Sequence, residues 1–230
     1  MSSFVGQEAE LGAWDPVWDD IFAARQWGKY PKEELIRFVA RNYYAAPDRQ
    51  AVRFLDLGCG FGAATWFLAR EGFSVEGIDG SELIIARLRE RLAAEGLTAG
   101  LVAGDAIDLP YPPAHFDCMI DLACLQHNSP DDTRRILDGV FDRLKPGGRL
   151  FSFTAAAGSW GDGLGAQVGP CTFTGITEGP FANAGLARFS DEAQIRDLYG
   201  RFELQLDLSE LTVAGRAHRL SNWIVEGRKP

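Results

Sequence analysis

The sequence predicts an α/β fold, in which helices cover both faces of a mostly parallel sheet, and three observations support this class. From Val52 onward, short apolar runs alternate with segments of helical periodicity. The runs are apolar at most positions rather than at alternate ones, which is typical of strands buried on both faces. A glycine-rich turn, "DLGCGFG", joins the first run to a helical segment.

The N-terminal segment, residues 1–50, is aromatic and acidic and is expected to be a helical extension that covers the active site. Pro31 suits the first position of a helix, and Leu35, Ile36 and Val39 then share one face. This pattern predicts an amphipathic helix that lies on the main body of the protein.

Residues 51–230 are expected to form one domain, since a chain of 230 residues can bury a full core. Near its end, Leu204, Leu206 and Leu208 alternate with polar residues, which favours a strand at an antiparallel edge. Strands are expected at 52–57, 73–79, 101–104, 116–121, 149–155, 202–208 and 221–229, and helices at 63–71, 82–94 and 131–144, with a turn at 145–148.

A long stretch at about 156–189 follows the fifth predicted strand and is too rich in glycine for a helix. Loops of this length inside a compact domain are usually disordered or functional. Because this one follows the carboxyl end of a strand and carries aromatic residues, we expect a lid over the substrate.

Composition argues against several classes of partner. The net charge of −9 repels phosphate backbones, so nucleic acid is not expected as a substrate. No apolar run is long enough for a membrane span, and the sequence begins without a signal-like segment, so a cytoplasmic location is expected. The four cysteines show neither paired nor zinc-like spacing, and we expect reduced thiols and no metal.

The glycine turn predicts a site for a ligand that lies against bare backbone, at Gly58, Gly60 and Gly62. The second predicted strand ends in Asp79, whose carboxylate can accept hydrogen bonds from both hydroxyls of a ribose. Asp105, at the end of the third strand, is placed to accept a hydrogen bond from an adenine amino group. Two acidic groups without basic neighbours indicate a nucleoside that lacks a pyrophosphate.

Taken in order, "FLDLGCGFGAAT", "VEGIDGS", "GDAIDLPYPPAHFDCMID", "LKPGGRL" and "SNWIVEGRK" resemble the class I S-adenosylmethionine-dependent methyltransferases of the small-molecule type. The resemblance implies a Rossmann-like, doubly wound, three-layer α/β/α fold with a seven-stranded, mostly parallel sheet and an antiparallel C-terminal strand. It also implies S-adenosylmethionine as cofactor, S-adenosylhomocysteine as product, and methyl transfer to oxygen or nitrogen of a small molecule.

The resemblance further implies which residues contact the cofactor. The first motif packs against the methionine part, the acid after the second strand binds the ribose, and the end of the third strand contacts the adenine. A backbone carbonyl after the fourth strand meets the amino group. The matching residues are Asp56, Leu57, Gly58, Gly60 and Gly62, then Asp79, Gly80 and Ser81, then Asp105 and Ala106, and finally Leu122. Trp27 and Tyr30 are expected near the amino-acid end, and Arg25 is a candidate partner for its carboxylate.

A sulfonium makes its methyl group electrophilic, so the protein mainly has to hold a nucleophile in line with it. A hydroxyl or ammonium acceptor also needs a general base. The candidates are His127, which follows the fourth strand, and His218, just before the last strand. The alternative for His127 is a hydrogen bond within its own loop, and for His218 an ordinary polar position at the start of a strand.

Two other functions are consistent with parts of the pattern. A nicotinamide-dependent reductase would have the spacing G-x-G-x-x-G, whereas Gly62 is followed here by Ala63 and Ala64. A protein that binds S-adenosylmethionine without turning it over, as a partner or scaffold subunit, would keep every cofactor motif. The sequence leaves open whether the protein is a monomer or a homodimer.

Overall fold

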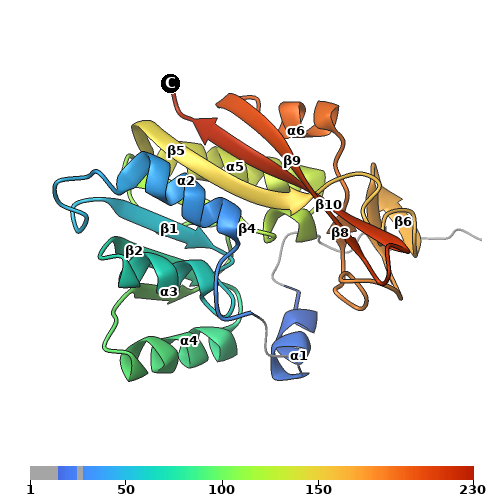
Figure 1. The fold of residues 1–230 in the computed structure, drawn as a ribbon, viewed down its shortest axis with the longest axis horizontal. Coiled ribbons are helices and arrows are strands. Elements are labelled where there is room, and N and C mark those ends of the chain that lie inside the picture. The colour runs from blue at the N-terminus through green and yellow to red at the C-terminus, as the bar shows by residue number, and fades with distance from the viewer. Residues whose placement is uncertain (1–14, 25–27) are drawn as a thin grey trace, which may run out of the picture.

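A computed structural model describes residues 15–24 and 28–230. Seven strands form one sheet in the order β3-β2-β1-β4-β5-β10-β9. The twist of this sheet is visible in Figure 1. The first five strands pair in parallel, and β10 runs antiparallel to both of its neighbours, so the predicted fold class is confirmed. The strands are β1 (Arg53–Leu57), β2 (Ser74–Asp79), β3 (Gly100–Ala103), β4 (Phe116–Leu122), β5 (Leu144–Ala155), β9 (Glu203–Val213) and β10 (His218–Arg228).

Helices cover both faces of the sheet because the strands are apolar on both sides. Leu35, Leu68 and Leu88 join one core cluster, whereas Ile136 and Ile195 join the other. Both clusters exclude water, which makes them the main source of stability. The helices of the first face are α2 (Glu33–Tyr43), α3 (Ala63–Arg70) and α4 (Glu82–Ala94), and those of the second are α5 (Pro130–Arg143) and α6 (Glu192–Leu198).

The ends of the chain's last strands differ from the prediction. The β9–β10 hairpin is longer than expected, and its pairing continues from Arg228 with Glu203 to His218 with Val213. The residues predicted as a turn, 145–148, lie within β5. There the pairing of β5 with β4 is irregular, because its register shifts between Phe116 and Cys118 of β4. A left-handed Gly147, at φ +75°, lets the chain make this detour.

The segment at about 156–189 is folded and has strands of its own, which the sequence did not predict. Three short strands form an antiparallel sheet beside the tip of the β9–β10 hairpin (Figure 1). Phe173, Ile176, Phe181 and Phe189 pack beneath them in a third apolar cluster. We call residues 156–189 the insertion. Its strands are β6 (Ala166–Gly169), β7 (Thr172–Thr174) and β8 (Ala187–Arg188).

Two further elements lie near the carboxyl ends of the parallel strands. The helix α1 (Val17–Ala24) precedes α2, and a single 3₁₀ turn, η1 (Leu125–His127), follows β4. Within the described ranges, no helix has the length and apolar character needed to cross a membrane.

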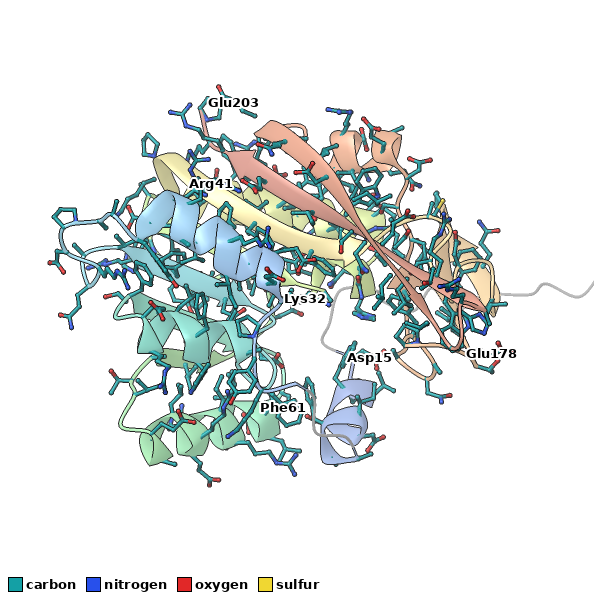
Figure 2. The ribbon with its side chains drawn as sticks, viewed as in Figure 1. Asp15, Lys32, Arg41, Phe61, Glu178 and Glu203 are labelled. Carbon is teal, nitrogen blue, oxygen red and sulfur yellow. The ribbon has the colours of Figure 1, made fainter. Side chains whose placement is uncertain are left out.

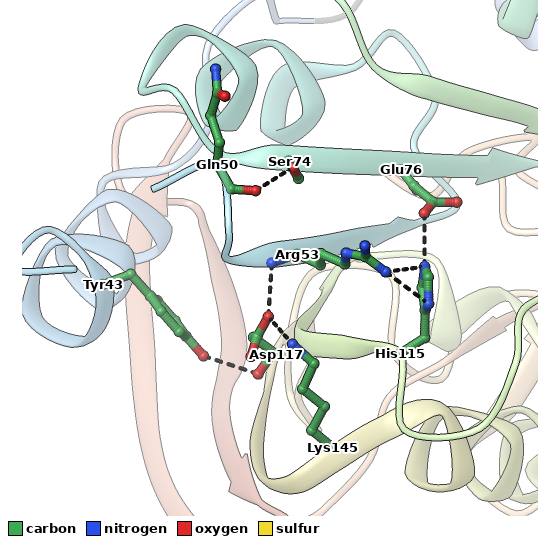
Figure 3. A network of polar contacts seen from close by, with 8 residues as sticks. All are labelled: Tyr43, Gln50, Arg53, Ser74, Glu76, His115, Asp117 and Lys145. Atoms are coloured by element: carbon green, nitrogen blue, oxygen red, sulfur yellow. Dashed lines mark hydrogen bonds and ion pairs between the residues drawn. The ribbon is translucent and has the colours of Figure 1, made fainter. Parts of the chain in front are cut away.

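A network of polar contacts ties together the opposite, amino ends of the strands (Figure 3). The backbone N–H of Arg53 in β1 and the ammonium of Lys145 in β5 both donate to the Asp117 carboxylate of β4, at 2.9 and 2.7 Å. His115 Nε2 lies 3.2 Å from Glu76 Oε1 of β2. These side chains satisfy one another across four strands, so we assign this edge of the sheet to structure rather than to ligand binding.

Candidate functional site

The glycine turn between β1 and α3 is left-handed at three positions. Gly58, Gly60 and Gly62 have φ angles of +62°, +49° and +73°. A Cβ on Gly58 would lie 2.5 Å from the side chain of Cys124, and one on Gly62 would lie 2.1 Å from Cδ1 of Leu88. A Cβ on Gly60 would meet nothing closer than 4.0 Å. Packing therefore requires glycine at the first and third positions, whereas the face of Gly60 is open.

Asp79, at the end of β2, lies directly beside this open face. Its carboxylate accepts hydrogen bonds from the backbone N–H groups of Gly60, at 2.9 Å, and Ser81, at 3.0 Å. Gly80 lies between Asp79 and Ser81 along the chain. Burial raises the pKa of Asp79, and the nearby carboxylate of Asp19 adds to the shift. The structure thus brings Gly60 and Asp79 together, as the sequence predicts.

Asp56 and Leu57 support the turn from the sheet. The buried Asp56 carboxylate accepts from the N–H and the hydroxyl of Thr65, at 2.9 and 2.6 Å, which ties β1 to the first turn of α3. Burial raises the pKa of Asp56 to about 7. Leu57 is buried in the second core cluster. The contacts of these two residues hold the turn in place.

The ends of β3 and β4 complete this edge of the sheet. Asp105 is half-buried and accepts from the N–H of Ile107 at 2.9 Å, and the adjoining Ala106 packs on the second core cluster. Leu122 ends β4, and Ala123 after it has a φ of +71°. A left-handed alanine is unusual, and such strain is often found at ligand sites. The sequence carries no signal for it.

His127 is held at both ring nitrogens. The amide oxygen of Gln126 accepts from the N–H of Ala155 at 2.7 Å, so the amide nitrogen of Gln126 donates to His127 Nε2 at 3.2 Å. The proton of the neutral ring is therefore on Nδ1, which donates to the carbonyl of Leu186 at 2.7 Å. Burial lowers the pKa of His127 to about 4. The ring is a neutral link between η1 and the insertion.

His218 and Tyr30 have contacts elsewhere. The His218 ring stacks on Trp160, with centroids 3.8 Å apart and planes 6° apart. Tyr30 is 69% exposed and packs edge-on against Trp66 of α3. Trp27 lies outside the described residues. Among the described contacts, none connects His218 or Tyr30 to the carboxylates at the glycine turn. The roles of these two residues stay predictions.

The helix α1 contacts this edge of the sheet from two sides, which the sequence did not reveal. The hydroxyl of Ser81 donates to the carboxylate of Asp19. Trp18 lies edge-on to His127, with ring centroids 4.7 Å apart, and Phe22 lies edge-on to Phe61 of the glycine turn at 5.5 Å. From its place in the first turn of α1, Asp19 would be expected only to interact with the helix dipole. The actual contact connects α1 to the residue that caps α4.

The residues at this edge fit a nucleoside that carries no phosphate. The open backbone at Gly60 is a cradle that any Cβ would fill, and carboxylates at Asp79 and Asp105 are hydrogen-bond acceptors for hydroxyl and amino groups. Among the residues that the structure describes, no cluster of three or more metal-ligating side chains is present.

Residues 54–148 match the family model of a methyltransferase domain. An uncharacterized methyltransferase of Synechocystis is 36% identical over 96 residues, which are 42% of this chain and 43% of that protein. An S-adenosyl-L-methionine-dependent Diels-Alderase of Neonectria is 31% identical over 103 residues, 45% of this chain and 38% of that protein. The matched regions thus span about two fifths of these relatives.

A solved structure of similar fold supports the assignment of the architecture. A methyltransferase of Methanosarcina mazei superposes with a TM-score of 0.65 at 23% identity, covering 77% of this chain and 92% of that one. A shared fold alone does not identify a family. The family match and the order of the motifs along the sequence supply evidence for one. Together they support a class I S-adenosylmethionine-dependent methyltransferase domain, matched over residues 54–148 of this chain.

Proposed function

We propose that this protein transfers a methyl group from S-adenosylmethionine to an oxygen or nitrogen atom of a small molecule. The main observation behind the proposal is the open space beside the backbone of Gly60. The N–H of Gly60 donates a hydrogen bond to the Asp79 carboxylate, which therefore lies next to this space. A ligand with a ribose fits this pair, because each carboxylate oxygen retains a lone pair after accepting one backbone N–H.

The proposed cofactor contacts follow from the positions of the strand ends. Asp79 accepts from the ribose hydroxyls, Asp105 from the adenine amino group, and the carbonyl of Leu122 from the amino group of the methionine part. The bound sulfonium would supply the electrophilic methyl group. The chain's own task is to orient the acceptor at near-attack distance and to exclude water.

The acceptor is proposed to be small and partly apolar. Trp18 of α1, His127 after β4 and Phe181 of the insertion form a series of neighbouring rings, with centroids 4.7 and 6.2 Å apart. Planar or apolar groups are favoured beside such rings. The insertion and the N-terminal extension would close over the acceptor, as the sequence predicts.

An alcohol or ammonium acceptor also needs a group that takes up its proton. His127 could use Nε2 only after the amide of Gln126 releases it. That geometry favours a positioning role for His127, with catalysis by His127 or His218 as the rival prediction. Site-directed replacement followed by the pH dependence of kcat separates a base from a positioning residue.

A second candidate is a protein that binds S-adenosylmethionine without transferring its methyl group. The bonded nitrogens of His127 favour it, and the Neonectria relative is named for a cycloaddition rather than a methylation. Release of S-adenosylhomocysteine with any acceptor would exclude this candidate.

Calorimetric titration of the purified protein with S-adenosylmethionine, S-adenosylhomocysteine and NADH tests the proposal. Both sulfur nucleosides should bind and NADH should not. Asp79→Ala should weaken both by about tenfold to a hundredfold, as expected for a lost charge-assisted hydrogen bond. Asp108→Ala, at an exposed neighbouring acid, is the matched control and should bind like the parent. Binding of NADH alone would overturn the proposal.

A further inference from the structure

Lys32 is a cation without a carboxylate partner among the residues that the structure describes. It directly precedes α2, is exposed, and holds its ammonium 4.4 Å from the centroid of the Phe153 ring. By contrast, the ammonium of Lys145 is paired with Asp117, and that of Lys229 donates to the carbonyls of Phe141 and Leu144.

The position of Phe153 places this cation at the functional edge of the sheet. Phe153 of β5 is in register with Leu122, the last residue of β4, and its carbonyl accepts from the N–H of Ala123 at 3.0 Å. In β1, Leu57 is in register with Asp121, so Gly58 follows at the level of Leu122. Figure 2 shows Lys32 at the start of α2, beside the end of β5.

Most of the other charges at this edge are negative. The guanidinium of Arg91 also reaches the glycine turn, but its two terminal nitrogens donate to the carbonyls of Phe61 and Lys29, at 2.6 and 2.7 Å. Asp56, Asp79 and Asp121 are buried carboxylates at or near the strand ends, and Asp19 approaches from α1. Such a set attracts a sulfonium and an ammonium, but it repels the α-carboxylate that an amino-acid ligand also carries. The buried guanidinium of Arg188 already donates to two carbonyls and two hydroxyls, so it has little capacity for a further anion.

We propose that Lys32 binds the α-carboxylate of the cofactor's amino-acid part, and so selects an amino-acid nucleoside over a plain thionucleoside. The inference rests on the proposed function, since it assumes a sulfur nucleoside at Gly60 and Asp79. The long, exposed side chain of Lys32 can leave the face of Phe153 for a carboxylate at little cost, because the cation–π contact of an exposed lysine is weak.

The test compares two ligands that differ in the amino-acid part. S-adenosylhomocysteine carries the carboxylate and 5′-methylthioadenosine does not. Lys32→Ala should weaken S-adenosylhomocysteine by about tenfold and leave 5′-methylthioadenosine within about twofold. Lys32→Arg should restore most of the affinity for S-adenosylhomocysteine. Lys29→Ala, which removes the same charge three residues away, is the control and should match the parent.

The experiment distinguishes failure of the proposed function from failure of the inference about Lys32. If the parent binds neither ligand, the proposed function fails. If the parent binds S-adenosylhomocysteine but Lys32→Ala does not weaken it, or weakens both ligands equally, only the inference about Lys32 is overturned. That inference is likewise overturned if Arg25→Ala, at a position outside the described residues, produces the selective loss and Lys32→Ala does not. If 5′-methylthioadenosine binds too weakly to titrate, the comparison uses affinity for S-adenosylhomocysteine alone. The inference about Lys32 is then overturned if Lys32→Ala lowers this affinity and Lys32→Arg does not restore it.

Discussion

Gly60 and Gly62 share a left-handed backbone and differ in what surrounds them, which yields a paired prediction. Gly60→Ala should cost about 1 kcal/mol of stability, the strain of a left-handed alanine, and should lower affinity for S-adenosylmethionine because the methyl group enters the cradle. Gly62→Ala should cost about 1–3 kcal/mol more, because its Cβ would lie 2.1 Å from Leu88. Urea denaturation and calorimetry on both variants provide the measurements.

The two variants check each other. Equal stability losses would contradict the packing argument at Gly62. Normal cofactor affinity in a folded Gly60→Ala protein would show that the ligand lies elsewhere.

The titration of His127 predicts a pH dependence of stability. Its pKa is about 4 in the folded protein and about 6.5 when unfolded, so the unfolded state binds the proton more strongly. The stabilising contribution of the neutral ring is therefore complete above pH 6.5 and is lost as the pH falls toward 4. From these two pKa values, the expected loss is about 3 kcal/mol. Urea denaturation at several pH values measures it.

Comparison with His127→Asn isolates this contribution. Burial raises the pKa of Asp56 to about 7 and that of Asp121 to about 6, so their protonation favours the folded state as the pH falls, with the opposite sign. The difference in unfolding free energy between parent and variant removes these shared terms. That difference should shrink between pH 6.5 and 4, and a constant difference would contradict a buried neutral His127.

At the scale of elements, hydrogen bonds from Arg188 connect the insertion to the loop after β4. Its buried guanidinium donates to the carbonyls of Asn128 and Leu125, at 2.6 and 3.1 Å, and to the hydroxyl of Thr133 at 2.7 Å. Arg188→Lys should cost about 1–3 kcal/mol, because an ammonium cannot reproduce the planar set of donors. It should also hasten proteolytic cleavage within the insertion.

The matched control is Arg196→Lys on α6. Arg196 forms an exposed ion pair with Glu192, so its replacement should change stability by no more than about 0.5 kcal/mol. If both variants behave alike in urea denaturation and proteolysis, Arg188 does not fasten the insertion.

The sequence predicted the elements whose identity depends on local pattern and missed those that depend on distant partners. Helix α4 has a cap at Ser81 and apolar residues at helical spacing, and the strands β1 and β4 are runs in which most residues are apolar. The insertion's strands are as short as two residues and form only against one another. Periodicity cannot detect such strands, which explains why the sequence predicts none within the insertion.

The candidate site divides in the same way. Gly60 and Asp79 could be paired from the order of their motifs, because parallel strands end at one edge of the sheet. The contact of Asp19 with Ser81, the bonds of Gln126 to His127, and the strained Ala123 had no signal in the sequence. Each depends on segments far apart in the chain or on a single backbone angle.

At the scale of the whole molecule, the sheet depends on β10, which lies between β5 and β9. Val225 of β10 is fully buried, whereas Leu211 of β9 is 60% exposed. Val225→Asp should cost more than about 3 kcal/mol or abolish folding, because it buries a carboxylate without a partner. Leu211→Asp should stay within about 0.5 kcal/mol of the parent. Circular dichroism during thermal unfolding compares them, and similar melting of the two variants would refute the dependence on β10.

The position of β10 has a consequence for the newly made chain. A ribosome produces β9 before β10, yet within the described part of the chain β9 pairs only with β10. During synthesis, β9 therefore leaves the exit tunnel as an unpaired strand, and the edge of β5 stays open until Arg228 has emerged. Unpaired edges can join a neighbouring chain. A nascent copy on a polysome is thus most exposed to aggregation in the interval when β9 has emerged and β10 is still inside the ribosome.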